Sequence, residues 1–150
     1  MSRIVTTVEA SGTRVKDLQH TPRTQGGAVV KAAKEIGDAL GAFALVAFTQ
    51  TGDTARRLSR LQPSERILVF TPDENVQRQM ALLWGAEAYL VWMVHTTDEM
   101  VRQVDAALIQ RGMCRPGELV IVVAGTPPNT PGGTNTIRVH HIGDVLQRDR

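Results

Sequence analysis

Residues 43–58 constrain the fold more than any other part of this 150-residue chain. The six apolar residues 43–48 predict a buried strand. They are followed by a polar turn, residues 49–54, and by a helix that opens with two arginines. A strand that leads through a Gly/Thr turn into a helix N-terminus is how open α/β sheets hold phosphate groups. The segment therefore predicts an α/β fold with an anion site.

Composition and charge exclude several classes of protein. The chain is 42% hydrophobic and 21% charged, which is ordinary for one globular domain. A net charge of +2 and an aromatic content of 4% argue against a nucleic-acid partner. No apolar run approaches the roughly 18 residues of a membrane span, so we expect no membrane partner. The single cysteine, Cys114, excludes an internal disulfide and predicts a cytoplasmic location.

Strand and helix patterns alternate along most of the chain. The predicted strands are residues 43–48, 66–70, 88–94 and 118–124, and the predicted helices are residues 24–40, 54–61, 74–83 and 97–112. Such alternation indicates a parallel sheet with right-handed crossovers. Residues 1–9 are expected to form a short helical piece, and residues 10–25 a linker.

The last connection breaks the alternation. Residues 125–135 contain three prolines and three glycines, so they cannot form a crossover helix. A fifth strand at residues 136–141 must therefore return antiparallel beside the fourth. The predicted fold is a three-layer α/β sandwich, with a five-stranded, mostly parallel sheet, an antiparallel fifth strand, and helices on both faces.

The turn after the first strand offers the chemistry for binding an anion. The first N–H groups of a helix have no helical partner, and Thr49, Thr51 and Thr54 add hydroxyl donors. Gly52 lets the backbone approach a ligand closely. The alternative is that Thr51 or Asp53 only caps the helix. Because a carboxylate repels phosphate, Asp53 would cap the helix or hold a ribose or sugar hydroxyl.

Two further features bear on the same site. Gly132, Gly133 and Thr134 can aim successive N–H groups at an oxyanion, unless the loop is only a surface hairpin. Arg56 and Arg60 share a helix face and either clamp a phosphate or form a solvated or subunit-contact face.

Candidates for catalysis are weak. His140 and His141 are adjacent on a strand, so they face opposite sides and cannot share a metal. Cys114 precedes a turn and is a poor nucleophile candidate. Trp84 and Trp92 are expected in the core or an interface, or stacked on a ligand ring. No catalytic sequence motif is present.

Two sequence patterns resemble the C-terminal regulatory domain of pyruvate kinase, most closely that of actinobacterial enzymes. They are Thr-x-x-Gly-x-Thr-Ala-Arg-x-Leu-Ser and Gly-x-Thr-Asn-x-Ile, and shorter matches extend the resemblance over residues 26–143. The resemblance implies a five-stranded sheet with an antiparallel fifth strand. It also implies that the first and last loops bind an allosteric sugar phosphate or nucleotide.

Carried over by position, the resemblance assigns an effector site to two loops. Its residues would be Thr49, Gln50, Thr51, Gly52, Asp53, Thr54, Gly132, Gly133 and Thr134. Many family members that bind fructose 1,6-bisphosphate have a small hydroxyl or basic residue where this chain has Asp53. A monophosphate such as glucose 6-phosphate, or AMP, therefore fits this loop better.

The resemblance also implies an assembly role and no catalysis by this chain alone. The family's catalytic barrel residues lie upstream of anything matched here, and the full enzyme would need Mg²⁺ and K⁺, which this chain would not bind. Residues 1–22 would be the end of that barrel plus linker, residues 23–145 the domain, and residues 146–150 a tail. Ile137 and Val139 on the fifth strand would mediate self-association, because an exposed sheet edge invites pairing.

Two alternative functions remain open at this stage. One is a free-standing phosphatase or hydrolase on the same fold, using Asp53 or Cys114. The other is a purely structural module that only assembles. Ligand binding distinguishes an effector domain from the structural module, and turnover would indicate the enzyme.

Overall fold

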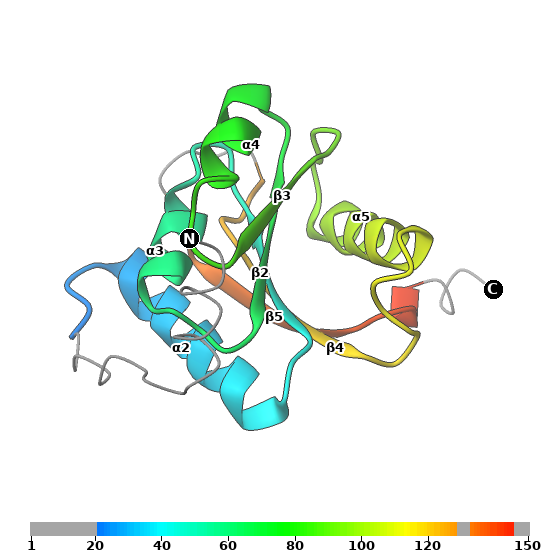
Figure 1. The fold of residues 1–150 in the computed structure, drawn as a ribbon, viewed down its shortest axis with the longest axis horizontal. Helices are drawn as coiled ribbons and strands as arrows, with labels where there is room; N and C mark the ends of the chain where they lie inside the picture. The colour runs from blue at the N-terminus through cyan, green and yellow to red at the C-terminus, as the bar shows by residue number, and fades with distance from the viewer. Residues whose placement is uncertain (1–20, 129–132, 146–150) are drawn as a thin grey trace, which may run out of the picture.

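A computed structural model describes residues 21–128 and 133–145, which form one five-stranded sheet in the order β3-β2-β1-β4-β5 (Figure 1). The strands are β1 (Ala44–Phe48), β2 (Arg66–Thr71), β3 (Ala86–Leu90), β4 (Leu119–Ala124) and β5 (Thr136–His141). The first four are parallel, and β5 pairs antiparallel with β4, with Ile121 opposite Val139. The predicted topology, including the antiparallel fifth strand, is confirmed.

Helices cover both faces of the sheet, as predicted. The helices are α2 (Gln25–Leu40), α3 (Asp53–Arg60), α4 (Glu74–Met80) and α5 (Thr97–Gln110). The helices α2, α3 and α4 lie on one face of the sheet and α5 lies on the other (Figure 1). Their side chains pack in two separate core clusters, one on each face. None of these described helices has both the length and the apolar character that a membrane crossing requires.

The strand β1 is buried on both faces, which explains its unbroken apolar sequence. Because side chains alternate along a strand, Leu45 and Ala47 pack beneath α2, α3 and α4, whereas Val46 and Phe48 pack beneath α5. The central strand β4 alternates in the same way. Burial of this central pair therefore fixes the register of the sheet.

The helix boundaries follow from local capping. The Thr24 side chain accepts a hydrogen bond from the Gly27 N–H at 3.1 Å, and α2 ends at Gly41 with a left-handed φ of 65°. The Asp73 carboxylate accepts hydrogen bonds from the first turn of α4. The predicted stop at Gly41 and the predicted cap at Asp73 are therefore confirmed.

Two predicted elements have wrong bounds. The strand predicted at residues 88–94 is β3, which begins at Ala86 and ends at Leu90, and α4 ends at Met80 rather than at residue 83. Beyond Val91, whose N–H still bonds the carbonyl of Thr71, the chain leaves the sheet. Residues 91–94 are apolar because they line a pocket, not because they continue the strand. The helical piece predicted at residues 1–9 lies outside the described residues.

Candidate functional site

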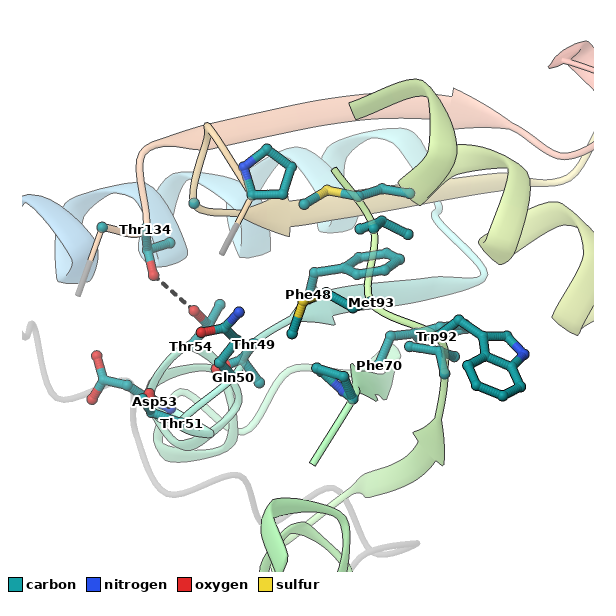
Figure 2. A pocket seen from close by; sticks show the side chains of 17 residues that line it. Phe48, Thr49, Gln50, Thr51, Asp53, Thr54, Phe70, Trp92, Met93 and Thr134 are labelled. Atoms are coloured by element: carbon teal, nitrogen blue, oxygen red, sulfur yellow. Dashed lines mark hydrogen bonds between the residues drawn. The ribbon is translucent and has the colours of Figure 1, made fainter. Parts of the chain in front are cut away.

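A pocket lies at the end of the sheet next to β1, the strand from which the chain builds the sheet first to one side and then to the other. From β1 the chain proceeds to β2 and β3 on one side, and then crosses to β4 on the other side of β1. The loops after β1 and β4 diverge at such a switch point, so ligands of open α/β sheets bind there. The pocket has a volume of about 80 Å³, enough for a small polar group and several waters. Figure 2 shows the side chains that line it.

The polar wall of the pocket is the loop between β1 and α3. The Thr49 hydroxyl accepts a hydrogen bond from the Gly52 N–H at 2.8 Å, and the Thr51 hydroxyl accepts one from the Asp53 N–H at 3.3 Å. Each hydroxyl keeps its own proton to donate. Gly52 has a φ of 86°, and a Cβ there would lie 2.6 Å from the Met80 methyl group. The positive φ favours glycine at this position, and any side chain there would also displace the end of the Met80 side chain.

The final loop contributes the opposite side of the polar wall. The hydroxyls of Thr54 and Thr134 are hydrogen-bonded at 2.7 Å, which joins two loops that lie 80 residues apart in the sequence (Figure 2). A Cβ on Gly125 would overlap the carbonyl oxygen of Gly133, so the two ends of the loop cross in close contact. The loops that the sequence predicted to share a site are thus brought together.

The base of this final loop is closed by side-chain hydrogen bonds. The Asn135 Oδ1 accepts from the Thr126 N–H, and the Asn135 Nδ2 donates to the Thr126 carbonyl, both at 2.8 Å. The hydroxyls of Thr126 and Thr136 are also 2.7 Å apart. These contacts hold Gly133 and Thr134 near the first loop.

Most of the predicted site residues line this one pocket. They are Thr49, Gln50, Thr51, Asp53, Thr54, Gly133 and Thr134. Gly52, the residue directly before α3, belongs to the same loop and is buried. Gly132 lies outside the described residues.

The apolar wall of the pocket was missed by the sequence interpretation. Phe48 and Phe70 stack with their ring centroids 5.2 Å apart, and Val91, Val94 and Met100 complete this wall. Trp92 and Met93 lie at the rim with exposed side chains, and the Trp92 indole points away from the polar loop (Figure 2). These residues could have been expected near the site from their position alone, because residues that follow parallel strands meet at the same edge of the sheet.

Two arginines near the loop are hydrogen-bonded both to the loop and to other parts of the protein. Arg56 donates to the Thr51 carbonyl at 2.9 Å and to Gln79 at 2.8 Å. Arg57 donates to the Asp53 carboxylate at 2.8 Å and to the Thr24 hydroxyl at 2.9 Å. Of the two cap residues that the sequence left open, Asp53 is the first residue of α3 after the N-cap Gly52, and the Thr51 hydroxyl is the one that accepts a first-turn N–H, that of Asp53.

The other titratable candidates do not form a reactive centre. Burial, with a hydrogen bond to Glu118, raises the pKa of the Cys114 thiol to about 12, so the thiol stays protonated at neutral pH. His140 is buried and lies 2.7 Å from the buried carboxylate of Asp105, whereas His141 is exposed. Within residues 21–128 and 133–145, no group of three or more His, Cys, Asp or Glu is placed to hold a metal.

The predicted interface residues lie on β5, which pairs only with β4 in the described sheet. Ile137 is half-buried against the cluster beneath α2, and Val139 is 44% exposed. Arg138 lies 3.5 Å from Asp98, which joins β5 to the first turn of α5. The second side of β5 is thus a free sheet edge among the described residues.

Fold and site together define an open α/β domain with a two-walled pocket at its switch point. The chain belongs to the pyruvate kinase family: residues 27–140 match the family profile described as "Pyruvate kinase, alpha/beta domain". The resemblance inferred from the two loop patterns is therefore confirmed.

Curated relatives and solved structures agree with this assignment. The chain is 48% identical to pyruvate kinase of Mycobacterium tuberculosis and 49% identical to that of Corynebacterium glutamicum, each over 144 residues. These matches cover 96% of this chain but 30% of each relative, so the chain spans about a third of their length. They also confirm the predicted likeness to actinobacterial enzymes.

The fold itself matches solved pyruvate kinases. A crystal structure of Cryptosporidium parvum pyruvate kinase has a TM-score of 0.73 at 22% identity, over 82% of this chain and 24% of that one. A structure of the C. parvum enzyme in complex with ADP also has a TM-score of 0.73, at 21% identity, over 94% of this chain and 27% of that one. At these identities the likeness concerns the fold alone.

Proposed function

We propose that this chain is the allosteric effector-binding and subunit-interface domain of a pyruvate kinase, and that its pocket binds a sugar monophosphate or AMP. One observation carries the proposal. The β1–α3 loop and the final loop, far apart in sequence, meet at the switch point and are joined there by the Thr54–Thr134 hydrogen bond.

The loop chemistry fits a phosphate group. The first-turn amides of α3 lack intrahelical partners and carry the positive end of the helix dipole. The hydroxyls of Thr49, Thr51, Thr54 and Thr134 lie around the same space and can each donate one hydrogen bond. A phosphate seated here would replace or join the Thr54–Thr134 bond and would contact both loops at once.

The regulatory mechanism follows from where the final loop leads. Ligand bound to both loops stabilises their closed arrangement, and the final loop continues directly into β5. A ligand with greater affinity for the closed arrangement shifts the population toward it. Self-association through β5, with Ile137 and Val139, would transmit that shift between subunits.

The parent protein would carry the catalytic activity. We propose that it transfers phosphate from phosphoenolpyruvate to ADP and uses Mg²⁺ and K⁺ on a separate barrel. This chain alone would bind effector and self-associate without turnover.

A ligand panel tests the proposal. Unfolding temperature and calorimetric affinity are measured with glucose 6-phosphate, AMP, fructose 1,6-bisphosphate, inorganic phosphate and phosphoenolpyruvate. A ligand at 100 times its Kd stabilises the fold by about 2.7 kcal/mol, a shift of several degrees.

A double variant then tests the location of the site. Thr51→Ala with Gly133→Ala should weaken effector binding roughly tenfold, because one pocket hydroxyl is lost and a methyl group is added to the pocket lining at residue 133. The control is Ser64→Ala, which removes a hydroxyl at the other end of the sheet, where Ser64 bonds Asp38. Wild-type affinity in the double variant would rule out this pocket.

A further inference from the structure

An arginine joins the start of α2 to the pocket. Arg57, on α3, donates through its Nε to the carboxylate of Asp53, a residue of the pocket lining, at 2.8 Å. It also donates through its Nη1 to the Thr24 hydroxyl, the N-cap of α2, at 2.9 Å. The Arg57 guanidinium is therefore shared between the pocket loop and the first turn of another helix.

A second contact reaches the same turn from the final loop. A Cβ on Gly26 would lie 3.7 Å from the Thr134 Cβ and 3.6 Å from the Arg57 Nε, so both of these residues lie directly against the first turn of α2. Thr134 in turn bonds the Thr54 hydroxyl in the pocket wall. Both sides of the polar wall are therefore linked to the start of α2.

The first turn of α2 is weak by its own sequence. It contains Gly26 and Gly27, and glycine is the least favourable residue in a helix after proline. It has no acidic side chain to balance the positive end of the helix dipole. The Thr24 hydroxyl closes the turn by accepting from the Gly27 N–H at 3.1 Å, and the Thr24 carbonyl accepts from the Ala28 N–H at 3.0 Å. The Arg57 bond holds that capping hydroxyl in place.

We propose that Arg57 is a positioning residue that couples the pocket to the first turn of α2, so that a ligand bound in the pocket orders this turn. The inference rests on the proposed function and adds a route of regulation besides β5. A ligand that holds the two loops closed also fixes Asp53 and Thr134, which contact Arg57 and the α2 turn respectively. In the parent protein proposed above, residues 21–24 join the domain to the barrel, so ordering them would restrict how the two parts move.

Hydrogen exchange at the first turn of α2 tests the coupling. Exchange of the Gly27 and Ala28 amides is measured by NMR in the full chain, with and without glucose 6-phosphate, AMP or inorganic phosphate, and calorimetry gives the affinity for each compound. In the wild type, saturating ligand should slow exchange at both amides roughly fivefold. Arg57→Gln should bind within a few-fold of the wild-type affinity, because Arg57 is not among the described residues that line the pocket, but it should lose the added protection.

Two further variants separate coupling from general loosening. The matched control is Arg56→Gln, which removes a neighbouring guanidinium that bonds the Thr51 carbonyl and Gln79 on the other side of the loop, and it should keep the ligand-dependent protection of α2. Gly26→Ala should slow exchange of the same amides roughly fivefold without ligand, because alanine favours the helix, and should leave less for a ligand to add.

The outcomes distinguish the inference from the proposed function. Ligand-dependent protection that is lost in Arg57→Gln and kept in Arg56→Gln supports the inference. Bound ligand with unchanged exchange at α2 in the wild type, or an equal effect in both arginine variants, overturns it and leaves the proposed function standing. If Arg57→Gln does not fold, Gly26→Ala decides, and a ligand effect as large as in the wild type overturns the inference. If none of the three compounds binds the wild type, the proposed function and the inference fail together.

Discussion

The polar groups that line the pocket at the carboxyl end of the parallel strands are mostly hydroxyls, whereas those at the amino end are mostly ionisable side chains that contact one another. The carboxyl end presents threonine hydroxyls and the Gln50 amide around an open pocket. The amino end contains the buried pair Asp105–His140 and a cluster in which Lys34 and Ser64 both bond Asp38.

The difference between the two ends of the sheet follows from what ionisable groups and hydroxyl groups each require of their surroundings. A buried ionisable side chain is costly unless its partner is fixed within the fold, and the buried Asp105 carboxyl has His140 as such a partner. A hydroxyl can accept a bond from its own loop and still donate to a ligand. The carboxyl end can therefore remain open to a ligand without leaving an unpaired charge.

The neighbouring carboxyl groups of Glu65 and Asp38, at the amino end of the strands, have pKa values shifted in opposite directions. Burial, with Asp38 close by, raises the pKa of Glu65, whose Oε2 is buried without a hydrogen-bond partner. Burial alone would raise the pKa of Asp38 as well, but hydrogen bonds from Lys34, Glu65 and Ser64 outweigh it and lower that pKa. One carboxyl of the pair thus favours its proton and the other its charge.

Breaking the buried pair at the amino end should have the largest effect. Asp105→Ala leaves His140 buried without its partner, and we expect a loss of about 3 kcal/mol in the free energy of unfolding, measured by urea denaturation. The control is Asp98→Ala on the same helix, which breaks the exposed pair with Arg138 and should cost less than about 1 kcal/mol. Equal costs would mean that burial does not distinguish the two pairs.

Crowding the carboxyl end should have an intermediate effect. A methyl group on Gly125 overlaps the Gly133 carbonyl, so Gly125→Ala should cost about 1–3 kcal/mol and weaken effector binding. Gly133→Ala is the matched control for stability, because a Cβ there has no atom within 4 Å among the described residues. Thermal unfolding with and without glucose 6-phosphate measures both effects. Indistinguishable unfolding temperatures would contradict the loop crossing.

Neutralising Glu65 should have the smallest effect and a defined pH dependence. Because its pKa is raised in the folded state, Glu65 contributes most to stability below its unfolded-state pKa, and this contribution is lost as pH rises through the folded-state pKa. Glu65→Gln should therefore stabilise the fold at pH 7, by less than about 1 kcal/mol, with the gain disappearing toward pH 4. Urea denaturation at both pH values measures it, and a gain that grows on acidification would refute it.

The sequence predicted the fold well where an apolar run is bounded by glycine, proline or other turn residues. The apolar runs of β1 and β4 and the Gly/Pro-rich loop before β5 were enough for the sheet and its antiparallel edge. The extent of β3 was wrong because hydropathy does not separate an edge strand from apolar residues that line a pocket. The polar wall of the pocket was predictable because its two loops have recognisable Gly/Thr sequence patterns. The apolar wall was not predictable, because its residues look like any other buried apolar residues.

Contacts between distant elements could not be predicted from local pattern. The bond from Arg57 to Thr24 joins residues 33 positions apart, and the sequence alone offers no reason to pair them. The sequence analysis also missed the ion pair between Asp53 and Arg57, although their i,i+4 spacing on α3 favours it.

The paired hydrogen bonds between Thr126 and Asn135 have a consequence for how this domain can change over evolutionary time. The Asn135 side-chain amide offers the Thr126 backbone the same donor and acceptor as a neighbouring peptide would, so it adds a rung to the ladder beyond β4 and β5. Insertions, deletions or exchanges between Thr126 and Asn135 should therefore leave the pairing of β4 with β5 unchanged, because these hydrogen bonds fix the two ends of the loop. The loop between Thr126 and Asn135 can therefore be replaced as a unit while the sheet is kept unchanged.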